Sequence, residues 1–137
     1  MRRLAGALGV LCVLLAVGCG GIKAPDLFIV KRSGTGSNAQ LTMLVNEEGG
    51  IRCNGGAELK LSDPQIVKAR AIQEDLKEPA AEHLALRANP GSVLAYSVRD
   101  VDGTVTFADN SSAQPKVLRS LALFVLEAAQ QVCHLPQ

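Results

Sequence analysis

The chain of 137 residues has few aromatic residues and no excess charge of either sign. It contains no Trp, one Tyr and three Phe, and 14 Lys and Arg residues stand against 13 Asp and Glu residues. Proteins that bind nucleic acids need a basic surface, and those that bind single strands also use aromatic side chains on which bases stack. The composition therefore predicts no nucleic-acid partner.

The chain also lacks the residue clusters that carry catalysis or hold a metal ion. It has two histidines, His83 and His134, and its four cysteines form no C-x-x-C pair. His83 has no nucleophile at a spacing that would make it a general base. Asp100 and Asp102 belong to a DVDG turn that lacks the closing Glu of a calcium-binding EF-hand loop. We therefore expect no enzymatic activity, no cofactor and no metal site.

The apolar run at the N-terminus is too short for a transmembrane helix. Residues 4–17 (LAGALGVLCVLLAV) are 14 uncharged residues that follow Arg2 and Arg3, whereas a spanning helix needs roughly 20 apolar residues. A cationic start, a short apolar run and small residues at its end are the three parts of an export signal. The alternative is an uncleaved anchor helix, which the length of the run disfavours.

The end of this signal resembles the bacterial lipobox. Residues 14–19 (LLAVGC) place a small residue before a cysteine, as in signals whose cysteine is acylated and becomes the mature N-terminus. Ala16 stands where that family usually has leucine. The resemblance implies cleavage after Gly18 and diacylglyceryl modification of Cys19. The acyl chains would then tether the protein to the lipid bilayer, at the outer face of the bacterial cytoplasmic membrane.

This interpretation divides the chain into three parts. Residues 1–18 are the signal peptide, residues 19–26 the lipidated N-terminus with a short Gly- and Pro-containing spacer, and residues 27–137 a single domain. Loss of Arg2 and Arg3 leaves 12 basic residues against 13 acidic ones, a net charge of −1. That balance predicts no polybasic patch for a membrane surface.

The four cysteines separate by position in the chain. Cys12 lies in the apolar run of the signal, and Cys19 is the lipid acceptor. Cys53 and Cys133 remain in the exported domain, where an oxidising compartment favours a disulfide between them. The alternative is a pair of metal-binding or redox thiols, which the absence of a C-x-x-C motif and of a His near Cys53 disfavours.

Alternating apolar residues and turn signals predict strands in two groups. Gly-rich turns join the first three strands, and Asp102 with Gly103 forms the turn of a later hairpin. The expected strands cover residues 27–33, 40–46, 51–54, 92–101 and 104–109.

Two helices are expected as well. The first begins at Ser62 or Asp63, where Gln65 completes a capping box, and Pro79 breaks or restarts its pattern. The second covers about residues 114–133, with apolar residues at the i, i+3, i+4, i+7 spacing and with caps supplied by Asn110, Ser111 and Ser112. Since 47% of the residues are apolar, a core can form. The predicted fold is α+β, an antiparallel sheet of four to five strands with both helices packed on one face.

Three segments resemble the emfourin-type inhibitors of thermolysin-like metalloproteases. They are IVKRSG near the start, PGSVLAYSVRDVDGTVTFADNS in the middle and QPKVLRSLALFV in the last helix, and the likeness spans residues 28–125. It implies inhibition by an exposed segment that occludes a protease cleft, either the turn at residues 34–38 or the residues before Leu27. Cys53 and Cys133 are not part of the inhibitor pattern. The chain is also similar to small lipoproteins of high-GC Gram-positive bacteria with a lipobox and a late Cys.

These observations leave three functional hypotheses. The first is a non-catalytic lipid-anchored domain that binds a protein, either a protease or another component of the cell envelope. The second is an emfourin-like inhibitor of a secreted or surface metalloprotease. The third is an enzyme whose site is assembled from distant polar residues, which the lack of nucleophile–base spacing disfavours.

Overall fold

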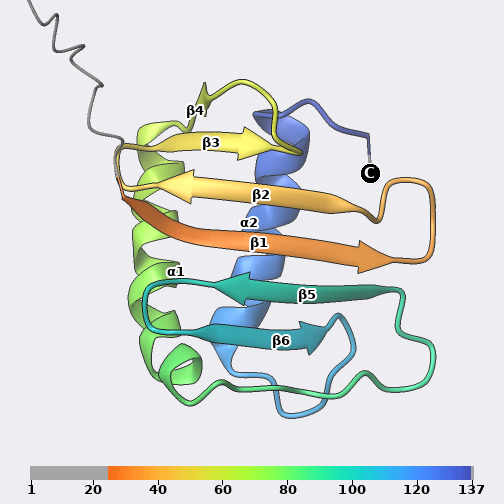
Figure 1. Cartoon of the computed structure of the whole chain (residues 1–137). Helices are drawn as coiled ribbons and strands as arrows, with labels where there is room; N and C mark the ends of the chain where they lie inside the picture. Colours follow the sequence, from red (N-terminus) through yellow and green to blue (C-terminus); the bar gives the residue numbers. More distant parts are fainter. Residues whose placement is uncertain (1–24, 137) are drawn as a thin grey trace, which may run out of the picture.

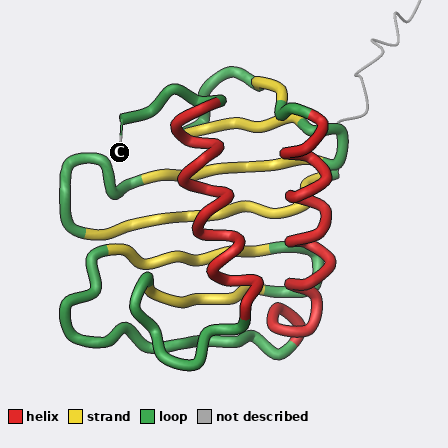
Figure 2. Tube along the Cα trace, turned by 180° about the vertical axis from the view of Figure 1, so that it is seen from behind, coloured by secondary structure: helices red, strands yellow, loops and turns green. Residues whose placement is uncertain are grey.

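A computed structural model describes residues 25–136 of the chain (Figure 1). The proposed signal peptide and Cys19 lie outside these residues. The described residues form an α+β fold, in which one antiparallel sheet of six strands is covered on one face by two helices. Figure 1 looks onto the open face of the sheet, and Figure 2 shows the helices from the other side.

The chain builds the sheet outward from its first strand. In the sheet the strands are ordered β4-β3-β2-β1-β5-β6, so that β1 is central and each later group extends one side. The strands are β1 (Asp26–Gly34), β2 (Leu41–Asn46), β3 (Gly50–Cys53), β4 (Leu59–Lys60), β5 (Leu94–Arg99) and β6 (Thr104–Ala108). The helices are α1 (Asp63–Ala81) and α2 (Lys116–Gln131).

The register of the central strands decides which side chains face the helices. Val30 of β1 is aligned with Met43 of β2 and with Val98 of β5, and all three are buried. Side chains alternate between the two faces of a sheet, so the two residues that flank Val30 point to the face opposite the helices. One of these neighbours, Lys31, is exposed on the open face.

The sheet has more strands than the four to five that were predicted. The additional strand, β4, has only two residues and pairs with Gly50 and Ile51 of β3. A strand of that length shows no apolar alternation, so the sequence pattern could not reveal it. At the other edge, Ala85 forms a bridge with Thr106 of β6. Short or covered edge strands limit pairing with other chains.

The first helix is longer than predicted because it continues through Pro79. The helix ends at Ala81, so the proline lies in the last turn. Proline lacks one backbone N–H, and near the end of a helix few hydrogen bonds are left to disrupt. At the other end, the backbone N–H of Ser62 donates to the Gln65 side chain over 2.9 Å, which confirms the capping box.

The second helix begins at Lys116, after the polar residues that were predicted to cap it. The predicted caps at residues 110–112 are used in the preceding turn instead. The Ser111 hydroxyl accepts a hydrogen bond from the backbone N–H of Ala108 over 2.9 Å. These residues therefore stabilise the connection from β6 to α2 and not the helix itself.

The core lies between the sheet and the helices and contains every aromatic side chain of the protein. Phe28 of β1 and Phe124 of α2 meet edge to face, with ring centroids 6.0 Å apart. Tyr96 of β5 stacks on Phe107 of β6 with centroids 4.8 Å apart. All four are buried. No aromatic side chain is therefore exposed on the part of the chain that the structure describes.

A disulfide joins Cys53, at the end of β3, to Cys133, just beyond α2. The two residues are 80 positions apart in the chain, and their Cα atoms are 6.3 Å apart. This is the bridge that the positions of the cysteines favoured. It attaches the last helix covalently to the β3 side of the sheet.

Candidate interaction site

The two helices leave part of the sheet uncovered on the face where they pack. In Figure 2 strands β1 and β2 continue past α2, on the side away from α1, to the β1–β2 loop (residues 35–40) that joins them. The uncovered region is a hollow of about 590 Å³. Its lining comes from β1, the β1–β2 loop, β5 with the preceding residue, and α2: Arg32, Thr35, Gly36, Ser37, Asn38, Ala39, Val93, Leu94, Tyr96, Ala122, Leu123 and Leu126.

The walls of this hollow carry large apolar side chains that are exposed to solvent. Val93 is 51% exposed, Leu123 is 49% exposed and Leu126 is 38% exposed. Single exposed apolar residues are common on protein surfaces, but a group of them in one depression marks a binding site. The hollow is therefore the candidate functional site of the described residues.

Arg32 and Tyr96 lie at the inner end of the hollow, opposite each other on β1 and β5. Arg32 is only 5% exposed. Its Nε donates to the carbonyl oxygen of Ala39 over 3.1 Å, and its Nη2 donates to that of Asn38 over 3.0 Å. Hydrogen bonds from a charged donor are stronger than those between neutral groups. Arg32 thus fixes the β1–β2 loop to the sheet.

Tyr96 stays protonated at neutral pH. Burial raises the pKa of its phenol above the ordinary value of 10.0, and Asp109 adds to the rise while the Arg32 guanidinium opposes it. The guanidinium also hydrogen-bonds the Tyr96 side chain. The inner end of the hollow therefore combines a neutral phenol with a cation that is already engaged by backbone oxygens.

A close backbone contact fixes the mouth of the hollow. The N–H of Thr35 donates to the carbonyl oxygen of Val93 over 3.1 Å. A Cβ atom on Gly34 would overlap that same carbonyl oxygen, so only glycine allows the two segments to approach this closely. The start of the β1–β2 loop is held against the start of β5 for this reason.

The site residues predicted from the sequence lie apart from this hollow or outside the described residues. Cys19 belongs to the latter group. Cys53 and Cys133 form the disulfide and do not line the hollow. The inhibitor resemblance indicated the turn at residues 34–38, and residues 35–38 of this turn line the hollow.

Sequence reasoning missed the apolar wall formed by α2. The spacing in residues 114–133 predicted one apolar stripe that packs on the core, whereas Leu126 of this helix is 38% exposed. The sequence held a signal: residues 121–126 (LALFVL) contain no polar residue, so α2 is apolar around more of its circumference than one packing face requires. Such a helix has a second apolar face, and here that face borders the hollow.

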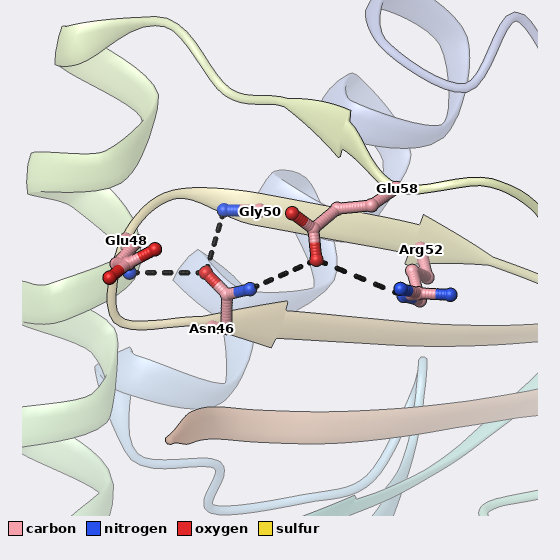
Figure 3. Close-up of polar contacts among 5 residues, drawn as sticks. All are labelled: Asn46, Glu48, Gly50, Arg52 and Glu58. Atoms are coloured by element: carbon pink, nitrogen blue, oxygen red, sulfur yellow. Dashed lines mark hydrogen bonds and ion pairs between the residues drawn. The ribbon is translucent and has the colours of Figure 1, made fainter. Parts of the chain in front are cut away.

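A second polar cluster, on the open face of the sheet, is structural (Figure 3). The Asn46 side-chain oxygen accepts from the backbone N–H of Gly50 over 2.7 Å and from that of Glu48 over 3.1 Å. Its amide nitrogen donates to Glu58 over 3.3 Å, and Glu58 lies 3.8 Å from Arg52. The Asn46 contacts hold the β2–β3 turn and the segment before β4 together.

The acidic turn that resembled part of a calcium loop is also structural. A side-chain oxygen of Asp100 accepts hydrogen bonds from the backbone N–H groups of Asp102, over 2.8 Å, and Gly103, over 3.1 Å. Within residues 25–136, no three or more His, Cys, Asp or Glu side chains are grouped so that they could hold a metal ion. None of the helices in that part of the chain is long and apolar enough to cross a membrane.

The residues that line the hollow can form apolar contacts and hydrogen bonds with a partner. The exposed apolar walls can bury apolar side chains, and the backbone of the fixed β1–β2 loop can form hydrogen bonds at the rim. No protein-family model, curated protein or solved structure matches this chain.

Proposed function

We propose that this protein is a non-catalytic lipoprotein, tethered through Cys19 to the outer face of the bacterial cytoplasmic membrane, and that it binds a protein partner. The observation that carries this proposal is the apolar hollow beside the β1–β2 loop, with exposed Val93, Leu123 and Leu126. The partner is a component of the cell envelope that covers these side chains.

Two features support the tether and the location. The first 19 residues have the layout of a lipoprotein signal, with Cys19 at the position of the lipid acceptor. The domain contains the disulfide between Cys53 and Cys133, a bond that persists in oxidising compartments outside the cytoplasm.

The composition of the hollow favours a protein partner over a small molecule. Pockets for small molecules enclose most of the ligand surface, whereas Val93 and Leu123 remain about half exposed at this site. Protein interfaces combine an apolar centre with a polar rim. Leu123 and Leu126 supply such a centre, and residues 35–38 supply the rim.

The binding site can be tested with one variant and a matched control. Leu123→Asp places a charge in the wall of the hollow, and Val67→Asp places the same charge on α1, where Val67 is 63% exposed. After crosslinking in the native membrane, the wild type and Val67→Asp should capture the same partner, and Leu123→Asp should not. Capture of that partner by folded Leu123→Asp, with its disulfide intact, would show that the hollow is not the binding site.

The tether has its own test. Cys19→Ser should abolish incorporation of labelled fatty acid and leave the unprocessed precursor in the cell, because the acyl acceptor is gone. The wild type, expressed in the same strain, provides the control. Continued lipid labelling of Cys19→Ser would refute acylation at this residue.

The emfourin-like inhibitor remains the second candidate, and the geometry of the β1–β2 loop favours it. The loop is exposed at residues 35–37, while Arg32 and Gly34 fix its two ends. A segment held in one conformation can occlude a cleft at a low entropic cost. Titration of a thermolysin-like protease with the folded protein should then slow proteolysis in proportion to the protein added. Unchanged proteolysis at a large molar excess would remove this candidate.

A further inference from the structure

The open face of the sheet gathers cations that are widely spaced in the sequence. Lys31 of β1, Arg52 of β3, Lys60 of β4 and Arg99 of β5 are all exposed. We call these four residues the cationic face. The near balance of acidic and basic residues predicted no basic patch for a membrane surface, but folding brings these four cations to one face of the sheet.

The pairing of the strands places two of these cations next to each other. Lys31 is aligned with Ser97, and Arg99 is aligned with Ile29, so that Lys31 and Arg99 are diagonal neighbours on β1 and β5. Side chains at such positions lie about 7–8 Å apart. A hollow of about 240 Å³ lies between them, lined by Ile29, Lys31, Ser97, Arg99 and Thr104.

This hollow has the chemistry of a phosphate site. Neither Lys31 nor Arg99 forms an ion pair or a side-chain hydrogen bond with another residue of the described range. Like charges on adjacent strands repel each other, so an anion between them would relieve the repulsion. Ser97 and Thr104 add two hydroxyl donors to the two cations. The remaining cations are Lys60 and Arg52, and the latter shares Glu58 with Asn46 (Figure 3).

The opposite side of the molecule has a different charge. Helix α1 carries four carboxylates, three of which lie in its second half, against three cations. These residues are Asp63, Glu74, Asp75 and Glu78, and Lys68, Arg70 and Lys77. Helix α2, on the same side, carries Lys116 and Arg119 against Glu127, so the two helices together have five cations and five carboxylates. The helix side therefore has no excess of cations, and an anionic surface would attract the sheet side more strongly.

We propose that the cationic face lies against the anionic phospholipid headgroups of the bilayer that holds the acylated Cys19, with a headgroup phosphate between Lys31 and Arg99. This inference rests on the proposed tether, because residues 20–25 are all that separate Cys19 from the start of β1. Six extended residues reach about 20 Å at most, so the sheet stays close to the bilayer. Attraction between Lys or Arg and anionic lipids falls off within a Debye length of about 8–10 Å, so it acts on the cationic face once the tether brings the sheet to the headgroups.

This orientation is compatible with the proposed partner site. The hollow beside the β1–β2 loop opens on the face of the sheet where the helices pack, and the cationic face is the other one (Figures 1 and 2). A bilayer on the open face leaves Leu123 and Leu126 accessible from outside. Membrane docking and partner binding can therefore occur together.

Lysine reactivity can test the orientation in the intact lipoprotein. The full chain, purified from bacterial membranes, is reconstituted in vesicles of phosphatidylcholine alone or with phosphatidylglycerol. It is then treated with an amine-reactive reagent, and labelling is measured by mass spectrometry. Lys31 and Lys60 should react several-fold more slowly on the anionic vesicles, whereas Lys116 of α2 should react equally on both. High salt should remove the protection, because it screens the attraction.

Two charge-matched double variants keep all of these lysines as probes. Arg52→Gln with Arg99→Gln removes two cations from the cationic face, and Arg70→Gln with Arg119→Gln removes two from the helices. The first pair should lose the protection of Lys31, and the second pair should retain it. Equal protection in both pairs would overturn the proposal.

Three other outcomes would also overturn it: Lys31 unprotected on anionic vesicles, Lys116 protected as strongly as Lys31, or Lys31 protected by inorganic phosphate on neutral vesicles. The last result would assign the hollow to a free anion and not to the membrane.

Flotation with phosphatidylcholine vesicles reports the Cys19 anchor separately. Loss of flotation refutes the tether, whereas normal flotation with an unprotected Lys31 refutes only the cationic face.

Discussion

The ring of Phe28 on the first strand meets the ring of Phe124 on the last helix edge to face, with an angle of 85° between the planes. This contact joins the two ends of the described chain in the middle of the core. The neighbouring residue on α2, Leu123, is 49% exposed and borders the hollow. Two adjacent apolar residues of one helix therefore have different roles, one in folding and one at a surface.

Phe124→Ala should destabilise the fold by about 3–5 kcal/mol, because it removes a buried ring and leaves a cavity. Leu123→Ala, the matched control, should change the free energy of unfolding by about 0.5 kcal/mol or less. Urea unfolding measures both changes. Similar losses for the two variants would contradict the placement of Phe124 in the core and of Leu123 at the surface.

Loss of the disulfide should destabilise the protein without abolishing the sheet. Cys53→Ala with Cys133→Ala releases a loop of 80 residues, and the expected cost is about 2–4 kcal/mol. The midpoint of urea unfolding of the double variant should fall by the corresponding amount. A reductant should lower the midpoint of the wild type but not that of the double variant, which has no disulfide to reduce. Mass spectrometry should find no alkylatable thiol at either cysteine of the exported protein. Two free thiols would contradict the bridge.

Gly103→Ala should be one of the most damaging substitutions in a turn. An added Cβ would overlap the carbonyl oxygen of Ala80, so the β5–β6 turn would have to move away from the end of α1. We expect a loss of about 3 kcal/mol or more. Gly91→Ala, where the added Cβ meets no atom, should cost about 1–2 kcal/mol from its positive φ alone. Equal losses would show that the contact with Ala80 is unimportant.

Ionisation of Tyr96 should depend on folding. The pKa is raised by burial in the folded protein and lies near 10.0 when the chain is unfolded, so the unfolded chain ionises first as the pH rises. The contribution of Tyr96 to the free energy of unfolding is therefore constant below about pH 10. Above that pH it declines, until the pH exceeds the pKa of Tyr96 in the folded protein. Because Tyr96 is the single Tyr and no Trp is present, phenolate absorbance reports this residue alone.

The titration midpoint should be higher in the folded protein than in urea. Tyr96→Phe should remove the corresponding part of the alkaline decline in stability while retaining the stacking on Phe107. Identical midpoints in the folded and unfolded protein would contradict the burial of the phenol. The same absorbance should respond when a partner covers the hollow, since Tyr96 lies at its inner end.

The elements that the sequence predicted well are those with several repeats of one pattern. The alternation in β2 and the i, i+3, i+4 spacing in α2 each involve enough residues to exclude other structures. The two-residue strand β4 has no such pattern. Pro79 predicted a break in the first helix, but α1 continues to Ala81. The end of the helix depends on how the following residues, 82–86, pair with Thr106 of β6, which local sequence does not encode.

The sequence by itself determined the α+β class and the pairing of Cys53 with Cys133. The lipoprotein signal, which rests on a resemblance at residues 14–19, stays a prediction. The class follows from the spacing of apolar residues and turn signals, and the pairing follows from which two cysteines remain in the exported domain. The tertiary structure alone decided the hollow and the cationic face. Val93 and Leu123 line one hollow because the two helices leave part of the sheet uncovered. Lys31 and Arg99 become neighbours only through the register of β1 with β5, a relationship between distant segments that local sequence does not encode.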